Sequence, residues 1–177
     1  MRRSSALLLG IVFVAGAAFA QMEVPKPAPE LKKLDFLVGN WTSEGELKPG
    51  PMGPGGKVAV DGHNEWMEGG FFLVLHSQYK SAAMGDGSGI AFMGYNADEK
   101  VYTYDEFNSS GEANHSKGTV EGDTWTWMSD LKMGPQTMKG RFTMKILSPT
   151  SYLYKFEVSP DGKNWNLFLD GKDTKNK

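Results

Sequence analysis

From Asn40 onward the sequence consists of short runs rich in aromatic and β-branched residues, separated by glycine, proline, asparagine and aspartate. This pattern is typical of antiparallel strands joined by tight turns. Connections such as Ser109–Gly111 and Glu121–Asp123 are too short for parallel crossovers, so they favour a meander of hairpins. We predict ten strands, over Trp41–Leu47, Lys57–Met67, Phe71–Tyr79, Gly89–Tyr95, Val101–Phe107, Ala113–Val120, Thr124–Leu131, Thr137–Leu147, Tyr152–Val158 and Trp165–Leu169.

Alternation in the predicted eighth strand separates an apolar face from a polar one. The two faces are Met138, Phe142, Met144 and Ile146 against Lys139, Arg141, Thr143 and Lys145. A sheet of ten strands with one apolar face either closes on itself or packs as a sandwich, because closure removes exposed edges. We therefore expect an all-β fold, an antiparallel up-and-down barrel of about ten strands.

One short helix is expected before the strands. Leu31, Leu34 and Leu37 recur at a spacing of three within Glu30–Val38, which places them on one side of a helix. Pro29 stands where a helix begins, and Gly39 can end it. A helix of about two turns is not stable alone, so we expect its leucines to pack against the barrel.

The first residues indicate export. Arg2 and Arg3 precede an almost unbroken apolar run over Ala6–Ala18, and Ala18–Ala20 has the small-x-small pattern of a signal-peptidase site. The run is shorter than the roughly 20 apolar residues that a membrane span requires. We predict a cleavable signal peptide over residues 1–20, a flexible proline-rich arm over 21–29 and a single barrel domain over 30–177, exported to the periplasm or outside the cell.

The net charge and the lack of cysteine exclude several classes of function. Without Arg2 and Arg3 the chain keeps 17 basic against 21 acidic residues, a net charge of −4, which argues against nucleic acid as a partner. The sequence contains no cysteine, so disulfides, thiolate catalysis and cysteine-held metals are excluded. The barrel must be held together by its core alone.

Several motifs resemble a known family. The run Leu34–Trp41, a leucine-rich turn leading into Gly39-Asn40-Trp41, is similar to the entry of calycin barrels, which include the lipocalins. More narrowly, the chain resembles DUF1579, a family of exported bacterial proteins of unknown function. The matching motifs are Leu34–Trp41, Glu65-Trp66 with Gly69-Gly70, Gly94-Tyr95-Asn96 and Gly118-Thr119.

The resemblance implies structural roles for Gly39 and Trp41. In calycins this tryptophan packs at the closed end of the barrel under the short helix, often covered by a basic side chain from a late strand. Arg141, the only arginine after residue 20, is one candidate for that cover, because its guanidinium can stack on an indole. Alternation instead places Arg141 on the solvent-facing side of its strand. Both interpretations of Arg141, as a cover for Trp41 and as a solvated surface residue, therefore stay open.

Polar residues on otherwise buried strands are the candidates for a binding cavity. A closed barrel of this size either fills with side chains or encloses one small ligand. Methionines and aromatic residues would suit an adaptable apolar cavity. The candidate ligand-binding residues are His63, Glu65 and Trp66, His76, Tyr104 with its neighbour Glu106, Arg141, and Tyr154. Taken singly, each of these residue types is more often a surface residue or a satisfied core residue.

Catalytic and metal-binding patterns are absent from the sequence. There is no Gly-x-Ser-x-Gly or His-Glu-x-x-His motif, and His63, His76 and His115 are widely scattered. We predict no metal site and no cofactor, and a non-catalytic role is favoured. The expected function is binding of a small, largely apolar molecule.

Two alternatives stay open. The nitrobindins, ten-stranded barrels with a similar Gly-x-Trp opening, bind haem through a histidine near the end of the chain. No histidine follows His115 in this sequence, so haem would require His76 or His115 in another geometry. The second alternative is a non-catalytic interaction protein of the cell envelope, which would present an exposed apolar patch or an open sheet edge.

Overall fold

The computed structural model describes residues 25–50, 53–83, 85–133 and 136–176. The predicted signal peptide and the first residues of the predicted arm lie outside these ranges. Within the described residues, no helix has the length and apolar character needed to cross a membrane.

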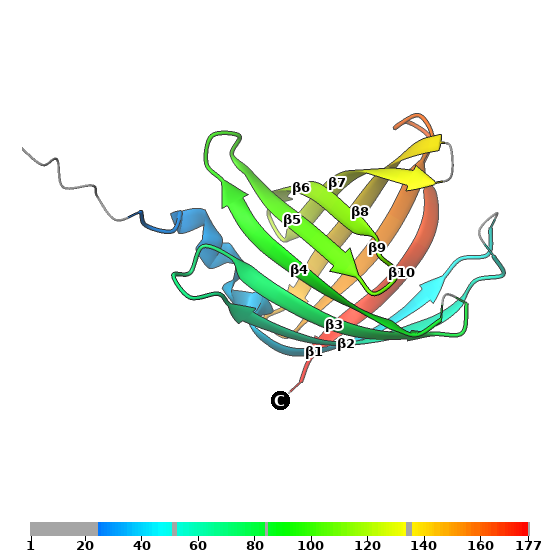
Figure 1. Ribbon diagram of the computed structural model, residues 1–177, viewed down its shortest axis with the longest axis horizontal. Helices are drawn as coiled ribbons and strands as arrows, with labels where there is room; N and C mark the ends of the chain where they lie inside the picture. Colours follow the sequence, from blue (N-terminus) through cyan, green and yellow to red (C-terminus); the bar gives the residue numbers. More distant parts are fainter. Residues whose placement is uncertain (1–24, 51–52, 84, 134–135, 177) are drawn as a thin grey trace, which may run out of the picture.

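Ten antiparallel strands form a closed barrel, which confirms the predicted fold class (Figure 1). Each strand is hydrogen-bonded to its neighbours in the sequence, and β1 also pairs with β10. The strands are β1 (Gly39–Leu47), β2 (Gly56–Trp66), β3 (Leu73–Ser81), β4 (Gly87–Asn96), β5 (Val101–Asn108), β6 (Ala113–Glu121), β7 (Thr124–Met133), β8 (Gln136–Ser148), β9 (Ser151–Ser159) and β10 (Asn166–Lys175).

The pairing of β1 with β10 closes the sheet. Its register runs from Trp41 opposite Lys175 to Leu47 opposite Leu169. The predicted last strand ended at Leu169, which was wrong, because β10 continues to Lys175. The residues from Asp170 to Lys175 are mostly polar and gave no strand signal, yet they are held by backbone pairing on both sides.

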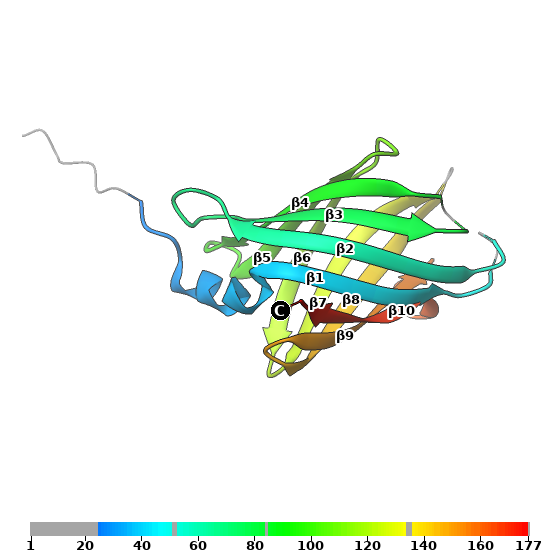
Figure 2. The same cartoon turned by 90° about the horizontal axis from the view of Figure 1, so that it is seen from below.

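A short 3-10 helix, η1 (Pro29–Leu37), lies across one end of the barrel (Figure 2). The spacing of three between its leucines matches the three residues per turn of this helix type. Leu31, Leu34 and Leu37 are all buried, with Leu34 fully inaccessible to solvent. The helix is therefore the apolar cover that the sequence pattern predicted.

Apolar side chains gather beneath the helix. Two parallel indoles, Trp125 and Trp127, stack with ring centres 6.2 Å apart. Gly118 on the neighbouring strand leaves room for the Trp127 ring, since a Cβ atom there would overlap it. The buried core at this end consists of Leu31, Leu34, Leu37, Leu73, Met93, Tyr102, Trp125, Trp127 and Met144.

Hydrogen bonds tie the helix to the barrel wall. The Leu37 carbonyl accepts one bond from Trp41 Nε1 at 2.7 Å and a second from Asn64 Nδ2 at 2.9 Å. The Tyr102 hydroxyl donates to the Glu30 carbonyl at 2.9 Å. The last carbonyls of a helix, such as that of Leu37, have no partner within the helix, so these side chains hold the cover in one position.

Candidate ligand cavity inside the barrel

Two adjoining pockets occupy the barrel interior. The larger has a volume of about 380 Å³, and the smaller of about 120 Å³. They share a wall formed by Leu75, Tyr104, Glu106 and Tyr152. The larger volume lies within the range of small-molecule sites in proteins, so the interior is not filled by side chains.

Apolar and aromatic side chains make most of the larger pocket. Leu37 of the helix forms part of the wall, so the pocket begins directly below the cover. Flexible thioethers and ring edges give such a surface the ability to adapt to an apolar ligand. The apolar lining consists of Leu37, Leu75, Met93, Trp127, Leu131, Phe142, Met144, Phe156 and Leu169.

Glu106 is the charged residue in the wall between the two pockets. Its carboxyl makes no hydrogen bond or ion pair with any residue that the structure describes. Burial raises the pKa of Glu106, and the nearby carboxylate of Glu112 adds to the rise. Burial likewise raises the pKa of the adjacent Tyr104 hydroxyl, with Glu106 contributing. A partly buried carboxyl without a partner favours either its neutral form or a bound positive charge.

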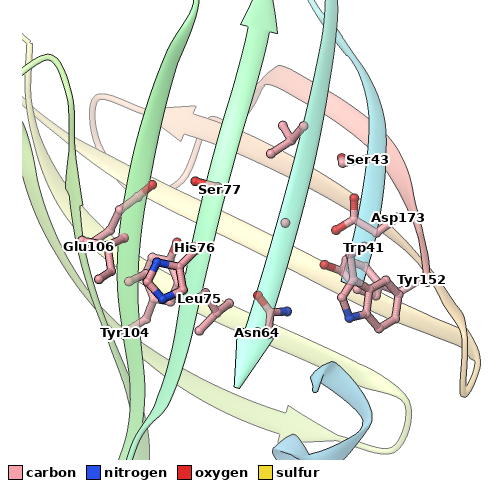
Figure 3. A pocket seen from close by; sticks show the side chains of 14 residues that line it. Trp41, Ser43, Asn64, Leu75, His76, Ser77, Tyr104, Glu106, Tyr152 and Asp173 are labelled. Atoms are coloured by element: carbon pink, nitrogen blue, oxygen red, sulfur yellow. The ribbon is translucent and has the colours of Figure 1, made fainter. Parts of the chain in front are cut away.

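A second carboxyl, Asp173 of β10, borders the smaller pocket (Figure 3). Burial raises its pKa, while the nearby hydroxyls of Ser43 and Tyr152 oppose the rise. Its Oδ1 atom is buried and has no hydrogen-bond partner among the described residues. In Figure 3, Asp173 and Glu106 lie on opposite sides of this pocket.

Tyr154 fills the part of the interior next to Asp173. Gly45 and Gly171 leave space for its ring and hydroxyl, because a Cβ atom at either position would overlap them. The Ser43 hydroxyl donates to the Tyr154 hydroxyl at 3.0 Å, and the Tyr154 ring stacks on Phe142 at 5.7 Å. This predicted ligand residue therefore packs inside the barrel, behind the side chains that border the pockets.

The structure brings together only some of the predicted site residues. Tyr104 lies in the shared wall of both pockets. His63 and Glu65 occupy the same face of β2, as expected, but it is the exposed outer face, with Nε2 of His63 3.8 Å from the Glu65 carboxylate. His76 borders the smaller pocket but is itself exposed, because Leu75 and Ser77 take the inward positions of β3.

The remaining predicted residues lie at the ends of the barrel or on its outer surface. Trp66 packs against the core below the helix and donates from Nε1 to Asp35 at 3.0 Å. Arg141 faces outward, as the alternation indicated. Its Cζ lies 4.1 Å from the centre of the Trp165 ring, and its Nε donates to Glu157 at 2.9 Å.

Gly39 and Trp41 lie where the chain passes from the helix into the first strand. Gly39 has a φ of +114°, a conformation that favours glycine, where the chain turns from η1 into β1. Trp41 is buried below the helix. Its basic cover is Lys175 rather than Arg141, with the Lys175 Nζ 5.3 Å from the ring centre.

The sequence analysis did not identify most of the polar residues that line the two pockets. Asp173 lies beyond the predicted end of the last strand, so its inward position could not be assigned. Asn114 and Ser116 alternate with exposed His115 and Lys117 on β6, and that alternation was the available signal. The polar residues that border the pockets beside Tyr104, Glu106 and Tyr152 are Ser43, Asn64, His76, Ser77, Asn114, Ser116, Ser129 and Asp173.

Histidines and metal ligands do not converge in the cavity. His115 lies on the outer face of β6, where its Nδ1 is 2.6 Å from Asp105. Within the described ranges, no group of three or more His, Asp or Glu side chains is arranged to hold a metal ion.

Comparison with known proteins shows the family. The structure of Rv2717c from M. tuberculosis has a TM-score of 0.59 and 15% identity, covering 86% of this chain and 100% of that one. The structure of the S-type phycobiliprotein lyase CPES from Guillardia theta has a TM-score of 0.55 and 10% sequence identity. This match covers 82% of this chain and 92% of that chain. At these identities the likeness concerns the fold. No curated protein sequence matches significantly. The model of DUF1579, a protein family of unknown function, matches residues 26–175, and the chain therefore belongs to the DUF1579 family.

Proposed function

We propose that this protein binds a small, largely apolar molecule inside its barrel. The observation that carries the proposal is the 380 Å³ pocket, whose wall is mostly apolar and aromatic and includes a few inward-facing polar groups. This combination is typical of small-molecule sites. The helix cover and closed sheet would shield the bound molecule from water at one end.

A neutral fluorescent probe tests the proposal. N-phenyl-1-naphthylamine should gain emission on binding to the purified protein, because its rings would leave water. A Ser116→Phe substitution should abolish the gain, since Ser116 borders the pocket and a phenyl ring there would occupy it. Thr119→Phe is the matched control, because Thr119 lies on the same strand but on the exposed face.

Three outcomes decide this test. Binding to the wild type and to Thr119→Phe, with loss in Ser116→Phe, supports a ligand inside the barrel. Equal emission from all three proteins would show that the probe binds elsewhere, and no emission from any would overturn the proposal. Circular dichroism should confirm that both variants are folded.

Haem binding finds less support from the geometry. His63 and His115 are exposed on the outer wall, and His76 is exposed beside the smaller pocket, so none is directed into the larger apolar pocket. These residues do not fit a haem site inside the barrel. Protein purified from its host should accordingly lack a Soret absorbance and should not acquire one with added haemin.

An interaction through an open sheet edge also finds less support, because the ten described strands close on each other and leave no unpaired edge. A protein that purifies as a monomer with no bound partner would agree with this reading.

Export to the periplasm or outside the cell is part of the same proposal. It rests on the basic, apolar and small-residue pattern of Met1–Ala20. N-terminal sequencing of protein from its host should begin at Gln21. A chain that retains Met1 would contradict export with cleavage.

A further inference from the structure

We infer that the bound molecule carries a protonated amine, and that Glu106 is its counter-ion. The inference rests on the proposed cavity and names the chemical class of ligand that the cavity would select. It is carried by the placement of one acidic side chain, by the absence of a basic side chain opposite it, and by the acceptors around it.

Glu106 is in the right place to meet a ligand in either pocket. Its side chain lies in their shared wall and is without a partner among the described residues. Glu106 is partly buried, and removing a carboxylate from water is costly unless it is paired. A cation in the cavity would supply the missing partner and would counter the rise in pKa that burial causes.

In the part of the chain that the structure describes, the rest of the lining contains no lysine or arginine, and its histidine, His76, is exposed at the edge of the smaller pocket. Lys175 points inward but lies over the Trp41 ring and borders neither pocket. A ligand carboxylate would therefore meet Glu106 and Asp173 with no lysine or arginine in the described lining to offset them, so the site disfavours fatty-acid-like molecules.

The polar groups around Glu106 fit the donors of an ammonium group. An amine cation has three N–H donors and no acceptor. Asn114 stands opposite Glu106 in the pairing of β5 with β6, and Ser116 stands opposite Tyr104. Both border the larger pocket and can accept a hydrogen bond through the amide or hydroxyl oxygen. The apolar wall would then hold the body of the ligand.

Three probes with one naphthalene ring test the inference by isothermal titration calorimetry at pH 7.5. They are 2-naphthylmethylamine, which is cationic, 2-naphthalenemethanol, which is neutral, and 2-naphthoate, which is anionic. We expect the amine to bind about tenfold more tightly than the alcohol, the usual advantage of a charge-assisted hydrogen bond. The naphthoate should bind most weakly.

The Glu106→Gln variant removes the charge and keeps the shape. Its amine affinity should fall to that of the alcohol, while alcohol binding stays within about threefold and so reports an intact pocket. Glu44→Gln is the matched control, because Glu44 is exposed on the outer face of β1. The control should keep the full preference for the amine.

The outcomes separate the inference from the proposed function. Equal binding of amine and alcohol by the wild type, tighter binding of naphthoate, or an unchanged preference in Glu106→Gln would overturn the amine assignment and leave an apolar ligand site standing. Failure of all three probes to bind the wild type would count against the cavity itself as a binding site.

Discussion

The barrel interior differs between its helix end and its middle in how many of its polar groups have hydrogen-bond partners. Below the helix, each inward polar atom described above has a partner, as where Trp41 and Asn64 both donate to the Leu37 carbonyl. Toward the middle, Glu106 lacks a partner and Asp173 keeps one buried oxygen unpaired within the described structure. The difference indicates that the helix end supplies stability, whereas the middle is organised for binding at some cost in stability.

The largest effect on stability should come from the helix end. Leu34→Ala would leave a void under the cover, and we expect a loss of about 2–5 kcal/mol in the free energy of unfolding. Urea denaturation followed by tryptophan fluorescence measures it. Leu153→Ala is the control, because Leu153 is exposed and its loss should change stability by no more than about 0.5 kcal/mol. Similar losses in both would remove the distinction between the cover and the outer wall.

Loss of a single hydrogen-bond donor at the helix end should lower the free energy of unfolding by a smaller amount. Trp41→Phe removes the Nε1 bond to Leu37 and part of the buried ring, for an expected loss of about 1–3 kcal/mol. The probe in the larger pocket should still bind, because Trp41 borders only the smaller one. Equilibrium unfolding and probe titration on the same sample measure both quantities. Loss of probe binding at unchanged stability would contradict the assigned roles.

Removal of the Glu106 charge should instead increase the free energy of unfolding at neutral pH. Because folding raises the pKa of Glu106, the folded state binds its proton more tightly than the unfolded state. Stability from this group is therefore complete below the unfolded pKa and is lost as pH rises through the folded pKa. At neutral pH Glu106→Gln should be more stable than the wild type, by on the order of 1 kcal/mol.

The pH dependence of that gain provides the control. The advantage of Glu106→Gln should vanish below about pH 4, where the carboxyl is neutral in both states. Asp173 titrates in both proteins and Glu112 remains in both, so their contributions to the difference are small. Thermal melts at a series of pH values measure the effect. A variant less stable than the wild type at pH 7 would show that Glu106 has a stabilising partner.

The smallest change in stability is expected from a substitution on the outer surface of the barrel. Arg141→Lys would lose the flat stacking on Trp165 and weaken the pairing with Glu157, for about 0.5–1 kcal/mol. Burial would raise the pKa of Glu157, but Arg141 and Lys155 outweigh it and lower that pKa, so the loss should shrink in acid. Probe affinity should not change. A weaker affinity would place Arg141 at the binding site after all.

The fold was predictable because local patterns repeat along the chain. Turn residues between aromatic and β-branched runs marked the strands, and the leucine spacing of three marked the helix. Alternation also placed Arg141 correctly on the outer face. The last strand was cut short because pairing by its backbone, rather than apolar side chains, holds Asp170–Lys175 in the sheet.

The cavity was less predictable. Alternation shows that His63 and Glu65 share a face, and the large apolar residues of β2, Val58, Val60 and Trp66, lie on the opposite face, which was the available signal that the two point outward. Tyr104 and Glu106 were identifiable as polar residues on one face of a strand. Their lack of partners depends on residues of other strands, so only the assembled barrel shows it.

The pairing of Trp41 with Lys175 also has a consequence for the order of folding. The strand that follows the helix is completed only by the strand that is synthesised last, so the barrel cannot close on a nascent chain that still lacks β10. Such distant pairings make folding slow relative to helical proteins. For a chain exported as proposed above, this late closure would leave the barrel open until β10 has been synthesised.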